Sequence, residues 1–128
     1  MALHVELVAA DRLVWSGEAE MVIARTTDGD VGILPGHAPM LCLLVDGVVD
    51  VRTTEGETWV AAVDSGFLSV ADDRISILSE HAEMSHEIDL EKARHELERA
   101  QAAGSDDDEA KEVLARAEAR IRAVERAR

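Results

Sequence analysis

The apolar residues of this chain follow two different periods, and the change from one to the other falls near Ser85. Before it, apolar side chains recur at every second position, which is typical of strands. After it, they recur at spacings of three and four, which places them on one face of a helix. The two periods predict an α+β protein with an N-terminal all-β sandwich of short strands over residues 1–86. A C-terminal antiparallel two-helix hairpin is expected over residues 87–128.

Turn residues divide the first part into short β-branched runs. Leu3, Val5 and Leu7 alternate with less apolar neighbours, and a further strand is expected over 18–26. Glu55-Gly56 and Asp72-Asp73 each separate two apolar runs, as hairpin turns do. Several short strands with regular turn signals are typical of a sandwich or a barrel, with one face of each strand inward.

The helical part has its own start and stop signals. Asp89 is a plausible N-cap, Gly104 stands where the first helix would end, and Ser105 can cap the second helix. The expected apolar seams are Leu90, Ala93, Leu97 and Ala100 in the first helix and Ala110, Val113 or Leu114, Ala117, Ile121 and Val124 in the second. Alanine buries little surface. We therefore expect the hairpin to exchange between conformations while the sandwich stays fixed.

Charge and composition exclude several classes of function. A formal net charge of -14 argues against binding to nucleic acid or to an anionic membrane surface, because both require clustered basic residues. No apolar run is long enough to span a membrane, and the N-terminus does not read as a signal peptide. Cys42 is the only cysteine, and its setting in "MLCLL" predicts a buried, unreactive thiol. We expect a soluble, cytosolic protein.

His37 stands in "LPGHAP", between two prolines. A general base needs an orienting partner and a nucleophile, and the neighbouring sequence offers neither. Two readings remain. His37 is either a loop residue bonded to the backbone, or part of a rigid loop that another protein recognises, since a rigid loop lowers the entropic cost of docking.

The segment "HAEMSHEID" concentrates histidines and carboxylates and raises the question of a metal site. His81 and His86 are five residues apart, which matches neither one helix face nor a known zinc spacing. We interpret the segment as a solvated linker between sandwich and hairpin and expect no metal.

Three motifs together resemble one protein family. "DGDVGILPGHAPML", "DSGFLSVADDRISIL" and "EIDLEKA" are similar to segments of the epsilon subunit of bacterial F-type ATP synthases, which corresponds to the mitochondrial delta subunit. The resemblance covers nearly the whole chain, in the family's order of β-domain first and two helices second.

The resemblance implies a non-catalytic rotor subunit of a proton-translocating ATP synthase. In this family the sandwich is clamped to the gamma subunit and rests on the ring of c subunits, so it couples proton flow to ATP synthesis. The chain would be peripheral, at the cytoplasmic face of the bacterial cell membrane. By motif match, Asp30 faces the loops of the c ring, and Pro35, Gly36 and His37 lie on the same edge. The alternative is that Asp28 and Asp30 only stabilise a turn.

The resemblance also implies a regulatory hairpin. In many members it extends into the catalytic head, where basic side chains meet the alpha and beta subunits and hinder ATP hydrolysis. The candidate contacts here are Arg116, Arg120, Arg122 and Arg126. The alternative is a solvated helix face with local pairs such as Glu112–Arg116.

Some members bind ATP on the folded hairpin through the motif I-D-x-x-R-A. The corresponding residues here are Ile88, Asp89, Lys92 and Ala93, with Glu83 as a further carboxylate. Lysine replaces the arginine of the motif and lacks its planar fork, so any regulatory ATP would bind weakly. A free-standing ATP-sensing module is the alternative function, and Lys92 argues against it.

Overall fold

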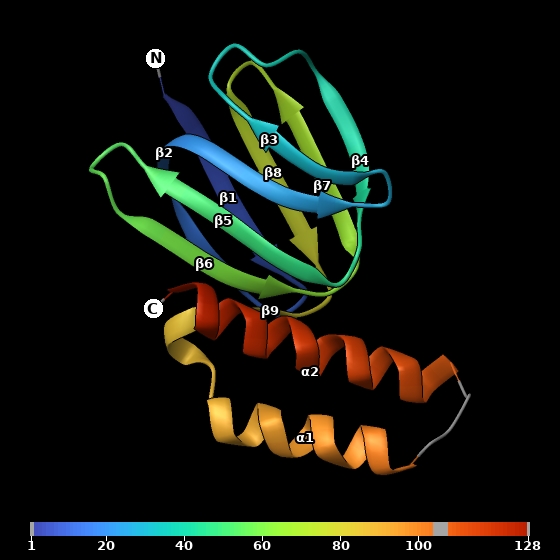
Figure 1. Ribbon diagram of the computed structural model, residues 1–128. Helices are drawn as coiled ribbons and strands as arrows, with labels where there is room; N and C mark the ends of the chain where they lie inside the picture. The colour runs from blue at the N-terminus through green and yellow to red at the C-terminus, as the bar shows by residue number, and fades with distance from the viewer. Residues whose placement is uncertain (1, 104–107, 128) are drawn as a thin grey trace.

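A β-domain occupies the first two thirds of the chain, and two helices follow it (Figure 1). The computed structural model describes residues 2–103 and 108–127, and within them the strands are β1 (Leu3–Ala9), β2 (Leu13–Thr26), β3 (Gly29–Ile33), β4 (Met40–Leu44), β5 (Gly47–Thr53), β6 (Thr58–Val63), β7 (Gly66–Ala71), β8 (Arg74–Ser79) and β9 (Ala82–Met84). The later elements are the 3-10 turn η1 (Ser85–Glu87), α1 (Leu90–Ala103) and α2 (Asp108–Ala127). The predicted α+β class is confirmed.

The long strand β2 joins the two layers of the β-domain. Its first half pairs antiparallel with β1, and its second half pairs with β3 and β5. β1 also pairs in parallel with β8, which continues through β7 to β4. On the other side the order is β2, β5, β6 and β9. The chain therefore closes two layers around one core.

The core consists almost entirely of aliphatic side chains. Alternate residues of β1 are buried, as the period of two predicts. The largest fully buried side chains are Leu3, Leu7, Ile33, Leu68, Ile75, Ile77, Val5, Val22, Val49, Val63 and Val70. Trp15 and Trp59 are partly buried and pack against the edge of this cluster.

The predicted turns are present. Gly56 has a φ of 87°, and Asp72 and Asp73 have φ values of 50° and 60°, which fits a tight two-residue hairpin turn. Gly66 meets a different constraint, because β7 approaches β8 closely there. A Cβ atom at Gly66 would lie 1.8 Å from the carbonyl oxygen of Leu78. Only glycine fits at that position without a shift of the backbone.

The segment expected to be a solvated linker is ordered instead, so that prediction is wrong. Ala82 and Met84 are buried in β9, which pairs with β6, and the next residues form η1. Arg12 Nη2 lies 3.2 Å from Glu87 Oε2 and ties η1 to the β1–β2 turn. The ring of His86 meets Trp59 edge to face, with centroids 5.7 Å apart. Within the described part of the chain, no three potential ligand side chains are grouped as a metal site.

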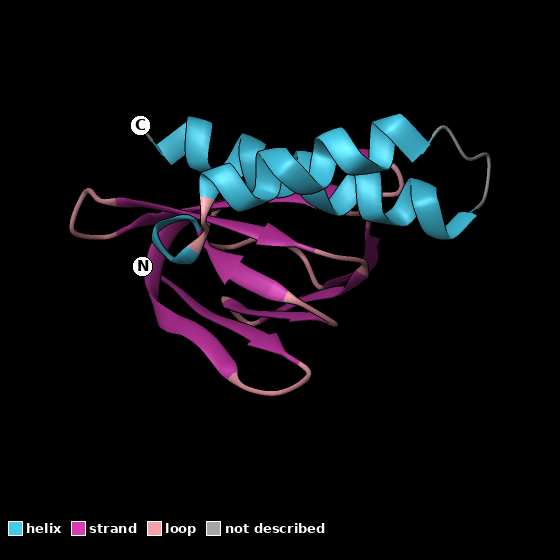
Figure 2. Ribbon diagram, turned by 90° about the horizontal axis from the view of Figure 1, so that it is seen from below, coloured by secondary structure: helices cyan, strands magenta, loops and turns pink. Residues whose placement is uncertain are grey.

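The two helices form an antiparallel pair on one side of the β-domain (Figure 2). Asp89 caps α1 as predicted, because its Oδ1 accepts a hydrogen bond of 3.1 Å from the backbone N–H of Lys92. The expected caps at Gly104 and Ser105 lie outside the described residues. None of the described helices is both long and apolar enough to cross a membrane.

α2 lies between α1 and the strands β5 and β6 and therefore buries two faces. Ala93 of α1 and Ala117 of α2 are buried, as the seams predict, whereas Val113 is 38% exposed. Ala119 and Ala123 form a second buried face, which the sequence reading missed. Ala123 packs in a small cluster with three buried residues of β5 and β6, Val48, Val60 and Ala62.

Candidate functional site

The loop after β3 is rigid. Pro35 and Gly36 occupy the centre of a turn in which the N–H of His37 donates to the carbonyl oxygen of Leu34 at 3.2 Å. Gly36 has a φ of 86°, as the third residue of a type II turn requires. Its N–H donates to Asp73 Oδ1 at 2.6 Å, so the loop is fixed to the β7–β8 turn.

His37 is bonded to the backbone of its own loop. Its Nδ1 lies 2.7 Å from the carbonyl oxygen of Ala38. No carboxylate or nucleophile among the described residues contacts the ring. The geometry fits a loop residue bonded to the backbone, and it offers no partner for general-base chemistry.

Asp30 lies near the start of β3, whereas the loop with His37 follows its end. The expectation that both lie on one edge of the sandwich stays a prediction. Asp30 is exposed and sits directly opposite Arg25 of β2, with 3.4 Å between Asp30 Oδ1 and Arg25 Nε. Asp30 is thus a surface charge with one close basic neighbour.

Three of the four candidate arginines of α2 contact the β-domain. Arg120 Nε donates to Glu83 Oε1 of β9 at 2.7 Å. Arg126 Nη2 lies 2.8 Å from Asp50 Oδ2 of β5. These pairs hold α2 against the strands.

Arg116 makes the third contact. Its Nε lies 3.4 Å from Asp64 Oδ2, and its Nη2 lies 3.6 Å from Glu112, one turn earlier in α2. The local Glu112–Arg116 pair considered from the sequence is therefore present, together with a long-range pair. Arg122 is exposed and forms no ion pair with any residue that the structure describes.

The candidate ATP residues are brought together. A cavity of about 220 Å³ is lined by all five of them, Glu83, Ile88, Asp89, Lys92 and Ala93, and by Glu87, Glu96 and Arg120. The volume is below the roughly 300 Å³ at which pockets for small molecules begin. Arg120 already donates to Glu83, and Asp89 accepts from the α1 backbone. The folded hairpin therefore leaves little room and few free polar groups for a nucleotide.

A stripe of apolar side chains crosses the outer face of the β-domain. Leu43 lies opposite Phe67, Phe67 opposite Leu78, and the line continues to Val8 and Leu13. Phe67 is 50% exposed and Leu78 49%. We call this set, Leu13, Val8, Leu78, Phe67 and Leu43, the apolar stripe. The signal in the sequence was the run "MLCLL", in which residues on both faces of the strand are apolar. The sequence analysis predicted only an inward apolar face.

Cys42, in the same strand as Leu43, is partly buried rather than fully buried. Burial, and secondarily the charge of Asp28, raise the pKa of its thiol above the ordinary value. The predicted lack of reactivity agrees with this direction, because the thiolate is the reactive form.

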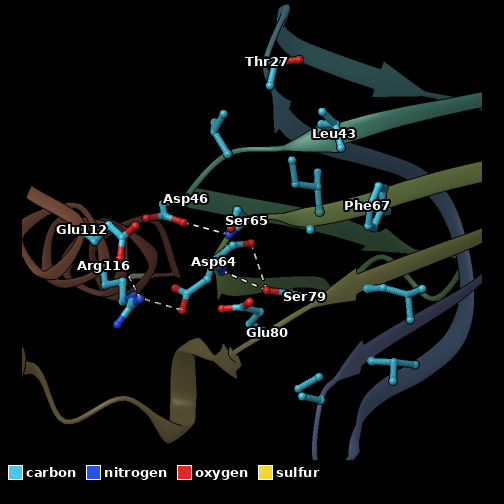
Figure 3. Close-up of a pocket in the computed structure, with 17 residues that line it drawn as sticks. Thr27, Leu43, Asp46, Asp64, Ser65, Phe67, Ser79, Glu80, Glu112 and Arg116 are labelled. Atoms are coloured by element: carbon cyan, nitrogen blue, oxygen red, sulfur yellow. Dashed lines mark hydrogen bonds and ion pairs between the residues drawn. The ribbon is translucent and has the colours of Figure 1, made fainter. Parts of the chain in front are cut away.

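The apolar stripe borders a groove of about 980 Å³ that ends at α2 (Figure 3). Asp64 lies at this end and is only 6% exposed. Its Oδ2 makes no hydrogen bond within the described structure, although Arg116 is near. Desolvation, followed by the charge of Asp46, raises the pKa of Asp64, and Arg116 opposes the shift. Sequence reasoning missed Asp64, because nothing near it in the chain marks it as buried.

Comparison with known proteins gives consistent matches. The family model for the β-sandwich domain of the ATP synthase delta/epsilon chain matches residues 2–85. The ATP synthase epsilon chain of Streptomyces avermitilis is 57% identical, over 95% of this chain and 94% of that one. The ATP synthase epsilon chain of Rhodococcus jostii is 50% identical, over 98% of each chain. A chain of the mitochondrial ATP synthase of Euglena gracilis, in a structure of OSCP, F1 and the c-ring in rotational state 1, superposes with a TM-score of 0.74. It is 27% identical, over 97% of this chain and 78% of that one.

Proposed function

Since this chain belongs to the ATP synthase delta/epsilon family, we propose that it turns with the rotor of a proton-translocating F-type ATP synthase. It is an epsilon chain, and in this role it couples proton flow to ATP synthesis without performing chemistry itself. The observation that carries the proposal is the match to epsilon chains, which extends through the β-domain and the helical hairpin. The expected location is the cytoplasmic face of the bacterial cell membrane, by attachment to the complex.

The gamma subunit is the proposed partner of the apolar stripe. Soluble proteins seldom expose aligned large apolar side chains without a binding role. Here Leu43, Phe67 and Leu78 are each about half exposed and lie in register on three neighbouring strands. Burying this row against gamma would remove apolar area from water. Because the row extends across several strands, its packing would also oppose rotation of one subunit on the other.

The c-ring loops are the proposed partner of Asp30 and of the loop Pro35–His37. The type II turn and the bond from Gly36 to Asp73 support a rigid contact surface. Asp30 is exposed, so a basic ring loop could replace Arg25 as its partner. Such charge pairs fix register more than they add affinity.

We infer that the hairpin inhibits ATP hydrolysis only after α2 leaves the β-domain. Arg116, Arg120 and Arg126 contact Asp64, Glu83 and Asp50 in the folded arrangement and cannot contact the alpha and beta subunits at the same time. ATP has at most a weak regulatory role, because the cavity in which the candidate ATP residues meet is small and Arg120 in its lining is already bonded to Glu83.

The proposal is tested with an ATP synthase complex depleted of its epsilon chain and reconstituted in vesicles. Added wild-type chain should restore ATP-driven proton pumping. Phe67→Asp should not, because it places a charge in the centre of the apolar stripe. The matched control Glu57→Gln, on an exposed turn far from the stripe, should restore pumping fully. Equal pumping with and without wild-type chain would refute the rotor role.

The inhibitory role needs a separate assay. Hydrolysis by an epsilon-free catalytic head is measured with the full chain, or with a chain that ends at Ser85. Slower hydrolysis with the full chain alone identifies the hairpin as the inhibitor, and Arg122→Ala then tests one of its candidate contacts. Equal rates with both chains would contradict inhibition by the hairpin.

A further inference from the structure

The groove beside the apolar stripe has two chemically different ends. Along the strands it is lined by aliphatic and aromatic side chains of β1, β4, β7 and β8. Where it meets α2, its described lining includes four carboxylates, those of Asp46, Asp64, Glu80 and Glu112, and one basic side chain, that of Arg116. A ligand of this groove therefore meets an apolar floor and a negatively charged end.

Asp64 is the buried member of this acidic end. The residue is 6% exposed, and its Oδ2 has no hydrogen bond within the described structure. Arg116 Nε, at 3.4 Å, gives partial compensation. A buried carboxylate oxygen without a hydrogen bond is costly, so a further donor at this point would stabilise it.

The backbone, and not the carboxylate, fixes the position of Asp64. Its N–H donates to Ser79 Oγ at 3.0 Å, and its carbonyl oxygen accepts from the same hydroxyl at 2.9 Å. Neighbouring Asp46 is held separately, since its Oδ1 accepts from the N–H of Ser65 at 2.8 Å (Figure 3). The carboxylate of Asp64 is thus held in the groove and is not used by the β-domain itself.

We propose that the acidic end of the groove binds a lysine or arginine side chain of the gamma segment that covers the apolar stripe. This inference rests on the proposed function, in which gamma is the partner of the stripe. A basic side chain suits the site because its aliphatic stem can lie along the apolar floor while its charged end reaches the carboxylates. One arginine facing four carboxylates leaves the end negative, which favours a cationic partner over a neutral one.

The two positive groups compete for one carboxylate. Arg116 belongs to α2, so a basic side chain of gamma that binds Asp64 weakens one of the three ion pairs between α2 and the β-domain. Attachment to the rotor and release of the hairpin are then linked through Asp64.

The experiment measures the affinity of the full chain for an epsilon-free catalytic head that contains gamma, at low and at high salt. Asp64→Asn keeps the size of the side chain and leaves the backbone bonds to Ser79 in place. It should weaken binding at low salt by at least about tenfold, because a buried charge pair is lost. It should also reduce the salt dependence of binding, which a purely structural defect would not do.

Arg116→Gln is the matched control. It breaks the same internal pair but leaves Asp64 charged, so binding should be unchanged or tighter. Equal loss of affinity in both variants would show that the internal pair matters and would overturn the proposal. Wild-type affinity and salt dependence in Asp64→Asn would overturn it as well.

A third variant separates this inference from the proposed function. Phe67→Asp should abolish binding if gamma covers the stripe. Lost binding in Phe67→Asp with wild-type binding in Asp64→Asn refutes the basic partner and keeps the docking surface. Unchanged binding in Phe67→Asp refutes the docking surface itself. If Asp64→Asn does not fold, Glu80→Gln removes one exposed charge from the same end. It should weaken binding about threefold at low salt, and an unchanged affinity would count against the proposal.

Discussion

Placing a charge at Ala123 should release α2 from the β-domain without unfolding the strands. Ala123 is fully buried, and it contacts the small cluster formed by Val48, Val60 and Ala62. The main core of the β-domain is a separate cluster. Ala123→Glu therefore perturbs the attachment of the helix and leaves the packing between the strand layers unchanged.

The magnitude follows from the nature of the attachment. A buried carboxylate without a partner costs several kcal/mol. The ion pairs that hold α2 are partly exposed, and such pairs contribute about 0–1 kcal/mol each. The alanine methyl groups at the same interface add about 0.8 kcal/mol per buried carbon. The free-energy cost of burying the introduced charge should thus exceed the free energy of the contacts that hold α2. Releasing the helix is therefore more favourable than burying the charge.

Hydrogen exchange followed by mass spectrometry measures this release. A shift of about 3 kcal/mol in the attachment lowers amide protection about 100-fold. In Ala123→Glu, peptides within 111–127 should lose protection by about this factor, while β1 to β8 keep wild-type rates. Ala127→Glu adds the same charge at an exposed position of the last turn and should change neither region.

Wild-type protection of α2 in Ala123→Glu would refute the reasoning. The alanine face would then not hold the helix, and the ion pairs would carry the attachment. Loss of protection in the strands as well would show that the two clusters are one cooperative unit.

Three further predictions concern the β-domain. Gly66→Ala should destabilise it by more than the roughly 1–3 kcal/mol of ordinary overpacking, because the added Cβ atom would clash with backbone. In the control Gly32→Ala, the added Cβ atom meets only a flexible side chain, so its stability should stay near wild type. Equal melting temperatures of the two variants would contradict the close approach of β7 and β8. Burial raises the pKa of Asp64 in the folded state, so its contribution to stability falls as pH rises from about 4 towards 7. Urea unfolding should show that the free energy of unfolding of Asp64→Asn increases relative to that of the wild type over this interval. A constant difference between the two would contradict the shift. Asp30→Arg should change the free energy of unfolding by no more than about 0.5 kcal/mol but should reduce ATP-driven proton pumping. Normal pumping would show that Asp30 is not part of the rotor contact.

The sequence predicted the strands well because their signals are local. Alternation along β1 and the turns at Glu55-Gly56 and Asp72-Asp73 each depend on a few neighbouring residues. The fold class and the two helices follow from the change of period, and Asp89 is recognisable as a cap from its position alone.

What the sequence did not predict depends on distant partners. Ala82 and Met84 alternate as a strand should, but three residues are too few to indicate one without knowledge of β6. Alanines at positions 119 and 123 fit several helix faces, so the second buried face of α2 appears only when β5 and β6 are beside it.

The candidate site shows the same division. The motif residues for ATP do meet at one cavity, yet the pair of Arg120 with Glu83 joins residues 37 positions apart. The apolar stripe is built from register partners on five strands, and register cannot be read from any one of them.

The parallel pairing of β1 with β8 has a consequence for synthesis of the chain. During translation, the edge of β1 that pairs with β8 has no partner until residues 74–79 have been synthesised. The hairpin of β5 and β6 closes a short loop and can form during translation, whereas one edge of β1 stays unpaired until β8 is available. High contact order of this kind slows folding, and an unpaired strand edge is prone to aggregation. Two exposed positions of β1, His4 and Glu6, are polar and interrupt the apolar surface of the unpaired strand.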